Sequence, residues 1–222
     1  MEKKLDIVFF CNLANIYWNE DINLKLSKIL ENLNVNIAKT LGYEVELSLN
    51  GTQTIKTIER PAFSNEDQKI SITFIDDRLD FKFILNEKED MKTSILKYFQ
   101  YLEDIVKEFQ LKIIRVGINC EKNNDNVFNL EKYYLPLKKE NIFEFGIKQG
   151  YQEEIIKGDS KILLNVLTVL EKGKGYNNFL LDFNTPVDEN GIEKNLREIF
   201  LNKVGEEIDK VFNNLLITAK GE

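Results

Sequence analysis

The sequence contains no histidine, and it has only 2 cysteines among its 222 residues. Histidine is the usual general base near neutral pH, and it takes part in Ser-His-Asp catalysis, in Cys-His catalysis and in most zinc sites. Two cysteines without histidine cannot complete a structural zinc site from Cys and His alone. These absences exclude the commonest hydrolase mechanisms, so an enzymatic function would have to rest on Asp, Glu and Lys side chains.

Proline and apolar runs are also scarce. The 3 prolines and 11 glycines leave little sequence for linkers. No run approaches the ~18 apolar residues that a membrane-spanning helix requires, and the charged start, Met1 to Asp6, lacks the apolar stretch of a signal peptide. Cys11 and Cys120 both lie in apolar, strand-like segments, which favours buried reduced thiols over a disulfide. We therefore expect a cytosolic protein without a membrane partner.

The charge balance is acidic, with a net charge of −7 and a pI near 5.0. Binding of duplex nucleic acid depends on clustered Lys and Arg side chains, so this balance argues against direct nucleic-acid binding. A hydrophobic content of 43% and an aromatic content of 11% are sufficient for a packed core. The composition therefore predicts a globular protein.

The region from residue 69 to residue 119 has the clearest secondary-structure pattern. Ile70–Phe74 and Leu79–Leu85 alternate between apolar and polar residues on either side of a turn at Asp76-Asp77-Arg78, which predicts a hairpin. Apolar residues then recur at three- and four-residue steps through Asp90–Phe109, as in an amphipathic helix. An apolar strand, Leu111–Asn119, completes the unit.

The remaining segments add a central strand, a first helix, a hairpin, further strands and a long terminal helix. In chain order these predicted elements cover Leu5–Leu13, Asp21–Leu41, Val45–Ile58, Phe143–Ile147 and Tyr151–Lys157 on either side of Gln149-Gly150, Lys161–Glu171, Phe179–Phe183 and Glu189–Thr218. Gly42 is predicted to end the first helix, and Asn50-Gly51 is predicted to form the hairpin turn. Arg60-Pro61 is predicted to end the second strand of the hairpin, and a polar connection, Ala62–Gln68, follows it. Lys161–Glu171 is apolar on both faces, which predicts a strand buried on both sides.

These elements predict an α+β fold, with antiparallel sheet of about nine or ten strands and three long helices. Strand, meander and long helix occur twice in this order. Two similar lobes, residues 1–110 and residues 111–222, are therefore one interpretation, with sheets that join edge to edge. A single domain, 1–222, is the alternative.

Several short motifs of this sequence resemble motifs of a known protein family. Phe63-Ser64, Lys69–Ile72, Asp77–Phe81 and Arg115–Asn119 resemble segments of an uncharacterised, sporadically distributed family of bacterial and archaeal proteins. In that family a hairpin with a D-R-L turn leads into a helix and an R-x-G strand, and the chain ends in a long helix. The resemblance implies this fold but no activity, because the family has none assigned. Sporadic distribution suits an accessory role in a mobile-element, phage or defence system.

The candidates for interaction are two aromatic residues before the first helix and a polar loop between residues 121 and 141. Exposed aromatic side chains would suit a protein-binding hot spot, whereas buried ones would only anchor the helix. The loop cannot bury its asparagines, although a tyrosine pair within it could dock on the body of the protein. These interaction candidates are Tyr17, Trp18, Asn123, Asn124, Asp125, Tyr133 and Tyr134.

Two groups of charged residues could have either a structural or a chemical role. Arg115 and Asp182 both lie in apolar strands, so we expect them to form a structural ion pair. Asp76, Asp77 and Asp80 surround a turn, where Asp is favoured for its backbone hydrogen bonds, although such a group could also bind a cation. No residue is assigned a catalytic, metal-binding or cofactor-binding role.

Three hypotheses of function follow. The first is a non-enzymatic protein-binding module, which includes an acidic inhibitor of a nucleic-acid enzyme as one version. The second is a metal-dependent hydrolase or nuclease, which requires three or more converging carboxylates. The third is a small-ligand protein with an apolar cavity between sheet and long helix. A homodimer through a sheet edge is compatible with all three, because antiparallel sheets leave edges that must be covered or paired.

Overall fold

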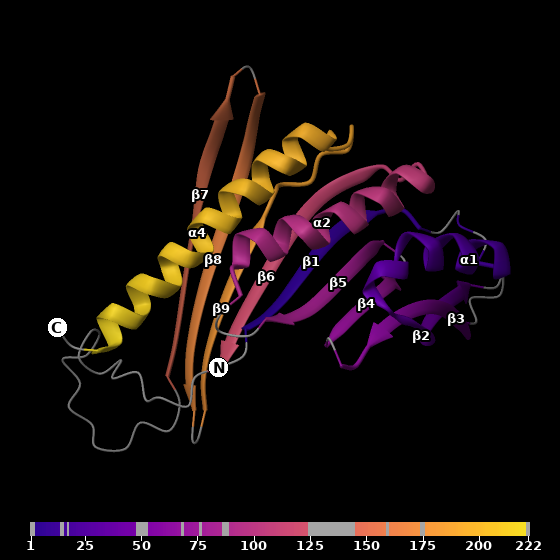
Figure 1. The fold of residues 1–222 in the computed structure, drawn as a ribbon, viewed down its shortest axis with the longest axis horizontal. Coiled ribbons are helices and arrows are strands. Elements are labelled where there is room, and N and C mark those ends of the chain that lie inside the picture. Colours follow the sequence, from indigo (N-terminus) through magenta and orange to yellow (C-terminus); the bar gives the residue numbers. More distant parts are fainter. Residues whose placement is uncertain are drawn as a thin grey trace.

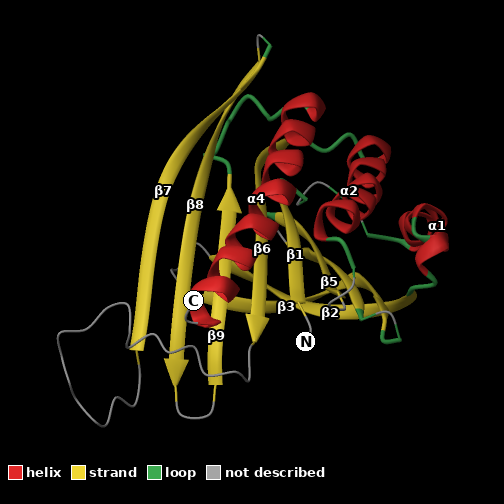
Figure 2. Ribbon diagram, turned by 60° about the vertical axis from the view of Figure 1, so that its left-hand side comes forward, coloured by secondary structure: helices red, strands yellow, loops and turns green. Residues whose placement is uncertain are grey.

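A single antiparallel sheet of nine strands forms the body of the protein, and three α-helices cover one of its faces (Figures 1 and 2). The structure is a computed structural model. It describes residues 3–13, 16, 18–47, 53–67, 69–75, 77–85, 89–123, 145–158, 160–173 and 176–220. The predicted α+β class is therefore confirmed.

The order of the strands across the sheet is β2-β3-β4-β5-β1-β6-β9-β8-β7, so the first strand of the chain occupies the centre. The strands are β1 (Lys3–Cys11), β2 (Asn36–Leu47), β3 (Gln53–Asn65), β4 (Ile70–Ile75), β5 (Arg78–Leu85), β6 (Ile113–Asn123), β7 (Phe145–Lys157), β8 (Ser160–Gly173) and β9 (Tyr176–Asn184). The helices are α1 (Glu20–Ile29), the short 3-10 helix η1 (Glu31–Leu33), α2 (Met91–Glu108) and α4 (Lys194–Lys220).

The core lies between the sheet and the helices. In β1 the alternating residues Leu5, Ile7 and Phe9 are buried beneath the helices. Asp90 caps the start of helix α2, because its side chain accepts a hydrogen bond of 2.8 Å from the backbone N–H of Thr93. Its buried stripe is the one that the helical period predicts, and one continuous core joins residues from both halves of the chain.

The strand order is mirrored about the central pair β1–β6. From β1 outward, one side of the sheet has the order β5, β4 and β3, and these strands precede α2 in the chain. From β6 outward, the other side has the order β9, β8 and β7, and these strands precede α4. Each unit contains a strand, a three-stranded meander and a helix, and the first unit also contains β2 and α1. The sheet and the core continue across residues 110 and 111, and the division into two lobes, like the alternative of a single domain, stays a prediction.

The predicted first helix is too long. Helix α1 ends at Ile29, Asn34 adopts a left-handed conformation (φ 47°), and β2 begins at Asn36. Asn is one of the few residues that accept this conformation readily, and it redirects the chain away from the helix. Ile37, which fits the helical stripe in the sequence, lies in a strand and is 54% exposed.

The second prediction that is wrong concerns Pro61, which does not end its strand. Strand β3 continues to Asn65, and Pro61 lies opposite Lys39 of β2. Strand β4 pairs with β3 only from Ala62 onward, so Pro61 lies where β3 has β2 as its only neighbour. A proline is tolerated there because no ladder hydrogen bond is lost on the side without a neighbour. In Figure 2 β2 and β3 run crosswise to the upright strands β6, β9 and β8.

Strand β8 is not buried on both sides. Ile162, Leu164 and Val166 are buried, whereas Leu163 and Leu167 are partly exposed. The reason is that the helices cover only one face of the sheet, as the two ribbon views show (Figures 1 and 2). The apolar residues on the other face of β8 therefore remain accessible.

Helices α2 and α4 are joined by a buried ion pair. The guanidinium of Arg197 donates two hydrogen bonds of 2.6 Å to the carboxylate of Glu103, and a third to the backbone carbonyl of Ile192. Both charged side chains are buried. A paired, bidentate arrangement is what a buried charge requires.

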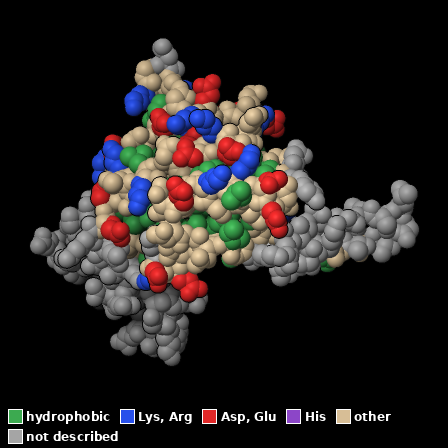
Figure 3. Space-filling view, turned by 45° about the vertical axis from the view of Figure 1, so that its right-hand side comes forward, with side chains coloured by type: hydrophobic (Ala, Val, Ile, Leu, Met, Phe, Trp, Pro, Cys, Tyr) green, Lys and Arg blue, Asp and Glu red, His purple; other side chains and the backbone are tan. Residues whose placement is uncertain are grey.

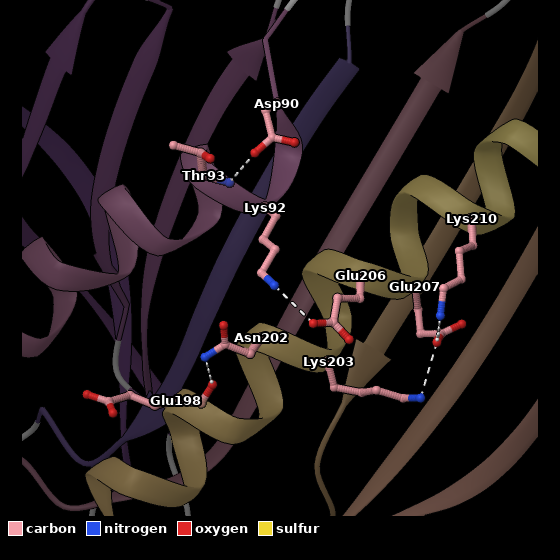
Figure 4. A network of polar contacts seen from close by, with 9 residues as sticks. All are labelled: Asp90, Lys92, Thr93, Glu198, Asn202, Lys203, Glu206, Glu207 and Lys210. Carbon is pink, nitrogen blue, oxygen red and sulfur yellow. Dashed lines mark hydrogen bonds and ion pairs between the residues drawn. The ribbon is translucent and has the colours of Figure 1, made fainter.

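Exposed charges on the helices are mixed rather than separated, as the face drawn in Figure 3 shows. Lys92 of α2 lies 2.9 Å from Glu206 of α4, and Lys203 of α4 lies 3.1 Å from Glu207 (Figure 4). Lys203 also lies 3.1 Å from Glu153 of β7. Gly205 allows the two helices to approach here, because a Cβ at this position would lie 3.2 Å from the Cα of Lys92.

Candidate functional site

Polar side chains form a row across the face of the sheet that the helices leave uncovered. Ser71 of β4 lies opposite Lys82 of β5, and Lys82 lies opposite Asp6 of β1. Asp6 in turn lies opposite Asn119 of β6, and Asn119 opposite Asp182 of β9. Side chains alternate between the faces of a strand, and the residues on either side of Asp6 are buried in the core. The row therefore points away from the helices.

Asp6 lies at the centre of this row and lacks donors. Its Oδ1 atom is inaccessible to solvent and has no hydrogen-bond partner in the described part of the chain. Its Oδ2 atom lies 4.0 Å from the Nζ atom of Lys82, a loose contact. Burial and the negative charge of Asp80 raise the pKa of Asp6 from 3.8 to about 6, against the opposing effect of Lys82 and Arg78. The described residues therefore leave the Asp6 carboxylate without enough hydrogen-bond donors.

A second carboxylate, that of Asp80, lies on the same face and is more deeply buried. Its side chain is only 1% exposed, and the Nε atom of Arg78 lies 3.1 Å from its Oδ1 atom. Neither carboxylate oxygen has a partner with hydrogen-bond geometry among the described residues. Burial raises the pKa of Asp80, while the charges of Arg78 and Lys82 oppose the rise. Two neighbouring carboxylates thus share too few donors.

A hollow of about 590 Å³ opens beside Asp6, between the β3–β4 turn and the central strands. Its charged and amide lining residues include Lys4, Asp6, Lys69, Lys82, Asn119 and Glu121. Charges of both signs surround the hollow, and the apolar side chains of Ile84 and Leu180 contribute to its wall. This volume lies within the range of ~300–1,000 Å³ that is typical of ligand sites.

A ladder of amide side chains continues the polar surface towards β7. Gln152 donates to Asn165 at 2.8 Å, Asn165 donates to Asn184 at 3.1 Å, and Asn184 donates to Asp182 at 3.2 Å. Each amide is oriented by the next one. The uncovered face therefore combines an ordered polar ladder with the unsatisfied carboxylates.

Of the predicted interaction residues, Trp18 is described and packs against the core. Its ring lies 5.1 Å from that of Phe74 in an edge-to-face arrangement. This favours the anchoring role over that of an exposed hot spot. Asn123 ends β6, where its backbone pairs with Asn178. The other interaction candidates, Tyr17, Asn124, Asp125, Tyr133 and Tyr134, lie outside the described residues.

The structure does not bring Arg115 and Asp182 together. Arg115 lies opposite Phe10 of β1, and its guanidinium is 5.1 Å from the centre of the Phe10 ring. Asp182 lies opposite Asn119, four residues further along β6, and accepts its hydrogen bond from Asn184. Both residues do lie on the uncovered face, but they are separated along the strands.

Of the three residues of the predicted acidic turn, the structure describes Asp77 and Asp80. Asp77 is exposed at the turn and Asp80 points to the uncovered face from within β5, while Asp76 lies outside the described residues. No group of three His, Cys, Asp or Glu residues that could hold a metal ion occurs in the described part of the chain. Cys11 and Cys120 are both buried and are not joined in a disulfide, and burial raises the pKa of Cys11 to about 12.

Sequence reasoning missed Asp6, Lys82 and Asn119 as site residues. The sequence does contain a signal for Asp6, because this charged residue lies between the apolar residues Leu5 and Ile7 of a predicted central strand. A charge at that place must either face solvent or find a partner. The alignment with Lys82 and Asn119 depends on strand register between distant segments, which the sequence pattern does not give.

Two other features bear on the hypotheses of function. A hollow of about 410 Å³ lies near the start of α4, where Leu163 of β8, Pro186 and Leu196 of α4 contribute to its wall. Among the helices described, none is long and apolar enough to cross a membrane.

No family model matches the chain, and neither a curated protein nor a solved structure shows significant similarity to it.

Proposed function

We propose that this chain is a non-enzymatic binding protein that receives another protein on the uncovered face of its sheet. The observation that carries the proposal is the unsatisfied carboxylate of Asp6, at the centre of a wide polar face with a hollow beside it. Buried polar groups without hydrogen bonds cost free energy, so proteins rarely retain them without a reason. The Oδ1 atom is buried, but the Asp6 side chain is 23% exposed in all, so a donor from a binding partner could reach the carboxylate from the exposed side.

The chemistry of the face suggests which side chain the partner contributes. Asp6 and Asp80 both have carboxylate oxygens without hydrogen-bond partners in the described part of the chain, and the negative charge of Asp80 repels that of Asp6 and raises its pKa. A lysine or arginine of the partner protein would relieve this repulsion and donate hydrogen bonds. The partly exposed apolar residues Leu163 and Leu167 of β8 extend the face beyond the polar row and offer contact area.

The version of this proposal in which the chain is an acidic inhibitor has less support. An inhibitor that occupies a basic groove would need carboxylates concentrated on one exposed face. On the helix side, drawn in Figure 3, basic and acidic side chains are interspersed. On the uncovered face, the hollow has three lysines, Lys4, Lys69 and Lys82, among its lining residues. We therefore propose a protein partner with a basic contact residue, and not a partner with an extended basic groove.

A small polar ligand is the second candidate. It is favoured by the size of the hollow, about 590 Å³, and by its lining of charges of both signs, which would suit a zwitterion. Its position differs from the cavity that the sequence hypothesis expected, because the hollow lies on the face opposite the long helix. Binding of a small ligand would stabilise the isolated chain against heat in a ligand screen, whereas a protein partner would not be present in such a screen.

Capture experiments with matched variants test the proposal. Wild-type protein, Asp6→Asn and Asp77→Asn would be immobilised and exposed to lysate of the source organism at pH 7.5. Asp77 is exposed at a turn outside the hollow, so Asp77→Asn serves as the control. We expect a stoichiometric protein retained by the wild type and by Asp77→Asn, and lost from Asp6→Asn. Retention by all three, or by none, would contradict the proposal.

A further inference from the structure

The outer edge of β7 has no neighbouring strand within the described chain. Strand β7 is the last strand of the sheet and runs for 13 residues, Phe145–Lys157. It contains no proline. The backbone N–H and C=O groups on the free side of such a strand are a template for pairing with another strand.

We propose that β7 pairs with β7 of a second copy of this chain, antiparallel and about a two-fold axis. Such an interface is isologous, so each residue contact occurs twice. When the axis is perpendicular to the sheet, the helices of both copies stay on the same face. Residues that lie opposite each other across the interface must then point to the same face of the joined sheet, so their numbers differ by an even number. The residue halfway between them therefore lies on the axis, opposite its own copy.

The length of β7 selects Tyr151 as that residue. Tyr151 is the middle residue of the strand, so a two-fold axis at Tyr151 allows all 13 residues to pair. In this register Lys148 of each copy lies opposite Glu154 of the other. Both residues are exposed, and they point to the same face because their positions differ by an even number. The full-length pairing is therefore also complementary in charge.

Neighbouring registers lose this complementarity. A shift that places Gly150 on the axis sets Lys148 opposite Gln152, and a shift that places Gln152 on the axis sets Lys148 opposite Ile156. A further shift that places Glu153 on the axis would oppose two like charges, which destabilises a strand pair. Charge complementarity and strand length thus favour the same register.

Two more observations fit a second copy at this edge. Tyr151 is 49% exposed, and the two Tyr151 side chains would adjoin at the axis and shield each other from solvent. Glu154 already has an ion pair with Lys161, but a carboxylate accepts several hydrogen bonds and can contact a second lysine. On the helix side, Lys203 holds Glu153 at 3.1 Å and so helps to fix the edge strand.

The charge pairing is tested with a reciprocal exchange. Sedimentation equilibrium would compare the wild type with Lys148→Glu, Glu154→Lys and the double variant, each checked for folding by thermal unfolding. We expect a wild-type dimer, a dissociation constant about tenfold higher or more in each single variant, and recovery in the double variant. A monomeric wild type, or single variants with unchanged association, would overturn the proposal.

The register is tested by oxidative cross-linking. Opposed residues of antiparallel strands have Cα atoms about 4.5–5.5 Å apart, within disulfide range, so Tyr151→Cys should cross-link to itself. Two copies of Gln152→Cys would be separated by roughly 8 Å and should not. The native cysteines are buried and do not compete. A dimer that cross-links through Gln152→Cys, or through neither variant, would overturn the register and with it the proposal.

Discussion

At the scale of single residues, Asp6 is held in an unfavourable state for a carboxylate. Its pKa of about 6 means that the folded protein retains a proton at a pH where the unfolded chain has lost it. Between about pH 4 and pH 6 the unfolded chain binds fewer protons than the folded protein, so the free energy of unfolding falls as the pH rises through this window. Above pH 6 the folded protein carries the full cost of a poorly satisfied charge.

Replacing Asp6 with Asn should therefore stabilise the protein at neutral pH. The amide keeps the shape of the side chain and removes the charge, so we expect a gain of about 2 kcal/mol at pH 7.5, equivalent to a rise in Tm of roughly 4–8 °C. At pH 4, where Asp6 is already protonated in the folded protein, the gain should disappear. Calorimetry at both pH values measures this, with Asp77→Asn as the control. A loss of stability at pH 7.5 would show that Asp6 is satisfied after all.

The buried pair of Arg197 and Glu103 has the opposite character, because every charge in it is matched. Replacing Glu103 with Gln leaves the Arg197 guanidinium buried without its counter-ion, and we expect a loss of about 3–5 kcal/mol in the free energy of unfolding. Lys194→Gln, which removes only an exposed pair with Glu198, should cost less than about 0.5 kcal/mol. Urea unfolding compares the two variants. A loss below about 1 kcal/mol for Glu103→Gln would refute the structural role of the pair.

At the scale of elements, the contact between α2 and α4 depends on a glycine within a helix. Glycine costs about 1 kcal/mol relative to alanine in such a position, so its presence in α4 requires a reason. A Cβ at Gly205 would meet the Cα, Cβ and Cγ atoms of Lys92 at 3.0–3.2 Å, and a backbone atom cannot move aside easily. The glycine therefore sets the distance between the helices.

A larger side chain at Gly205 should separate α4 from α2. We expect Gly205→Val to lower the free energy of unfolding by about 2 kcal/mol or more, because the helix must shift or the core must open. Glu198→Val, at an exposed position of the same helix, should cost only the difference in helix propensity and the exposed ion pair with Lys194, together below about 1 kcal/mol. Chemical unfolding of both variants decides the matter. Equal effects would mean that the close approach is unimportant.

Elements with a long, regular pattern were predictable from the sequence. The hairpin β4–β5, helix α2 with its cap at Asp90, and the central strand β1 follow from apolar period and capping chemistry. The boundary between α1 and β2 could not be found, because Leu30, Leu33 and Ile37 fit a helical stripe equally well. The left-handed Asn34 decides that boundary locally, and tertiary pairing with β3 decides the strand.

At the scale of the whole molecule, the uncovered face is the feature that the sequence could not predict. Apolar residues on both faces of β8 suggested burial on both sides, but the three helices lie on one face only. The candidate site results from register, which aligns Lys82, Asp6 and Asn119 from three separate segments of the chain. A charged residue within an apolar strand indicates that such a site can exist, but it does not identify its neighbours.

The measurement that tests the binding role of this face most directly is site-specific photocrosslinking. A photoreactive amino acid would be placed at Lys82 or Asn119 on the uncovered face, and at Lys25 or Glu198 on the helices as controls. After irradiation in lysate of the source organism, we expect one protein to be cross-linked from Lys82 and Asn119 and not from the helix positions. Adducts that form only from Lys25 or Glu198 would contradict this account, because the partner would then bind the helices.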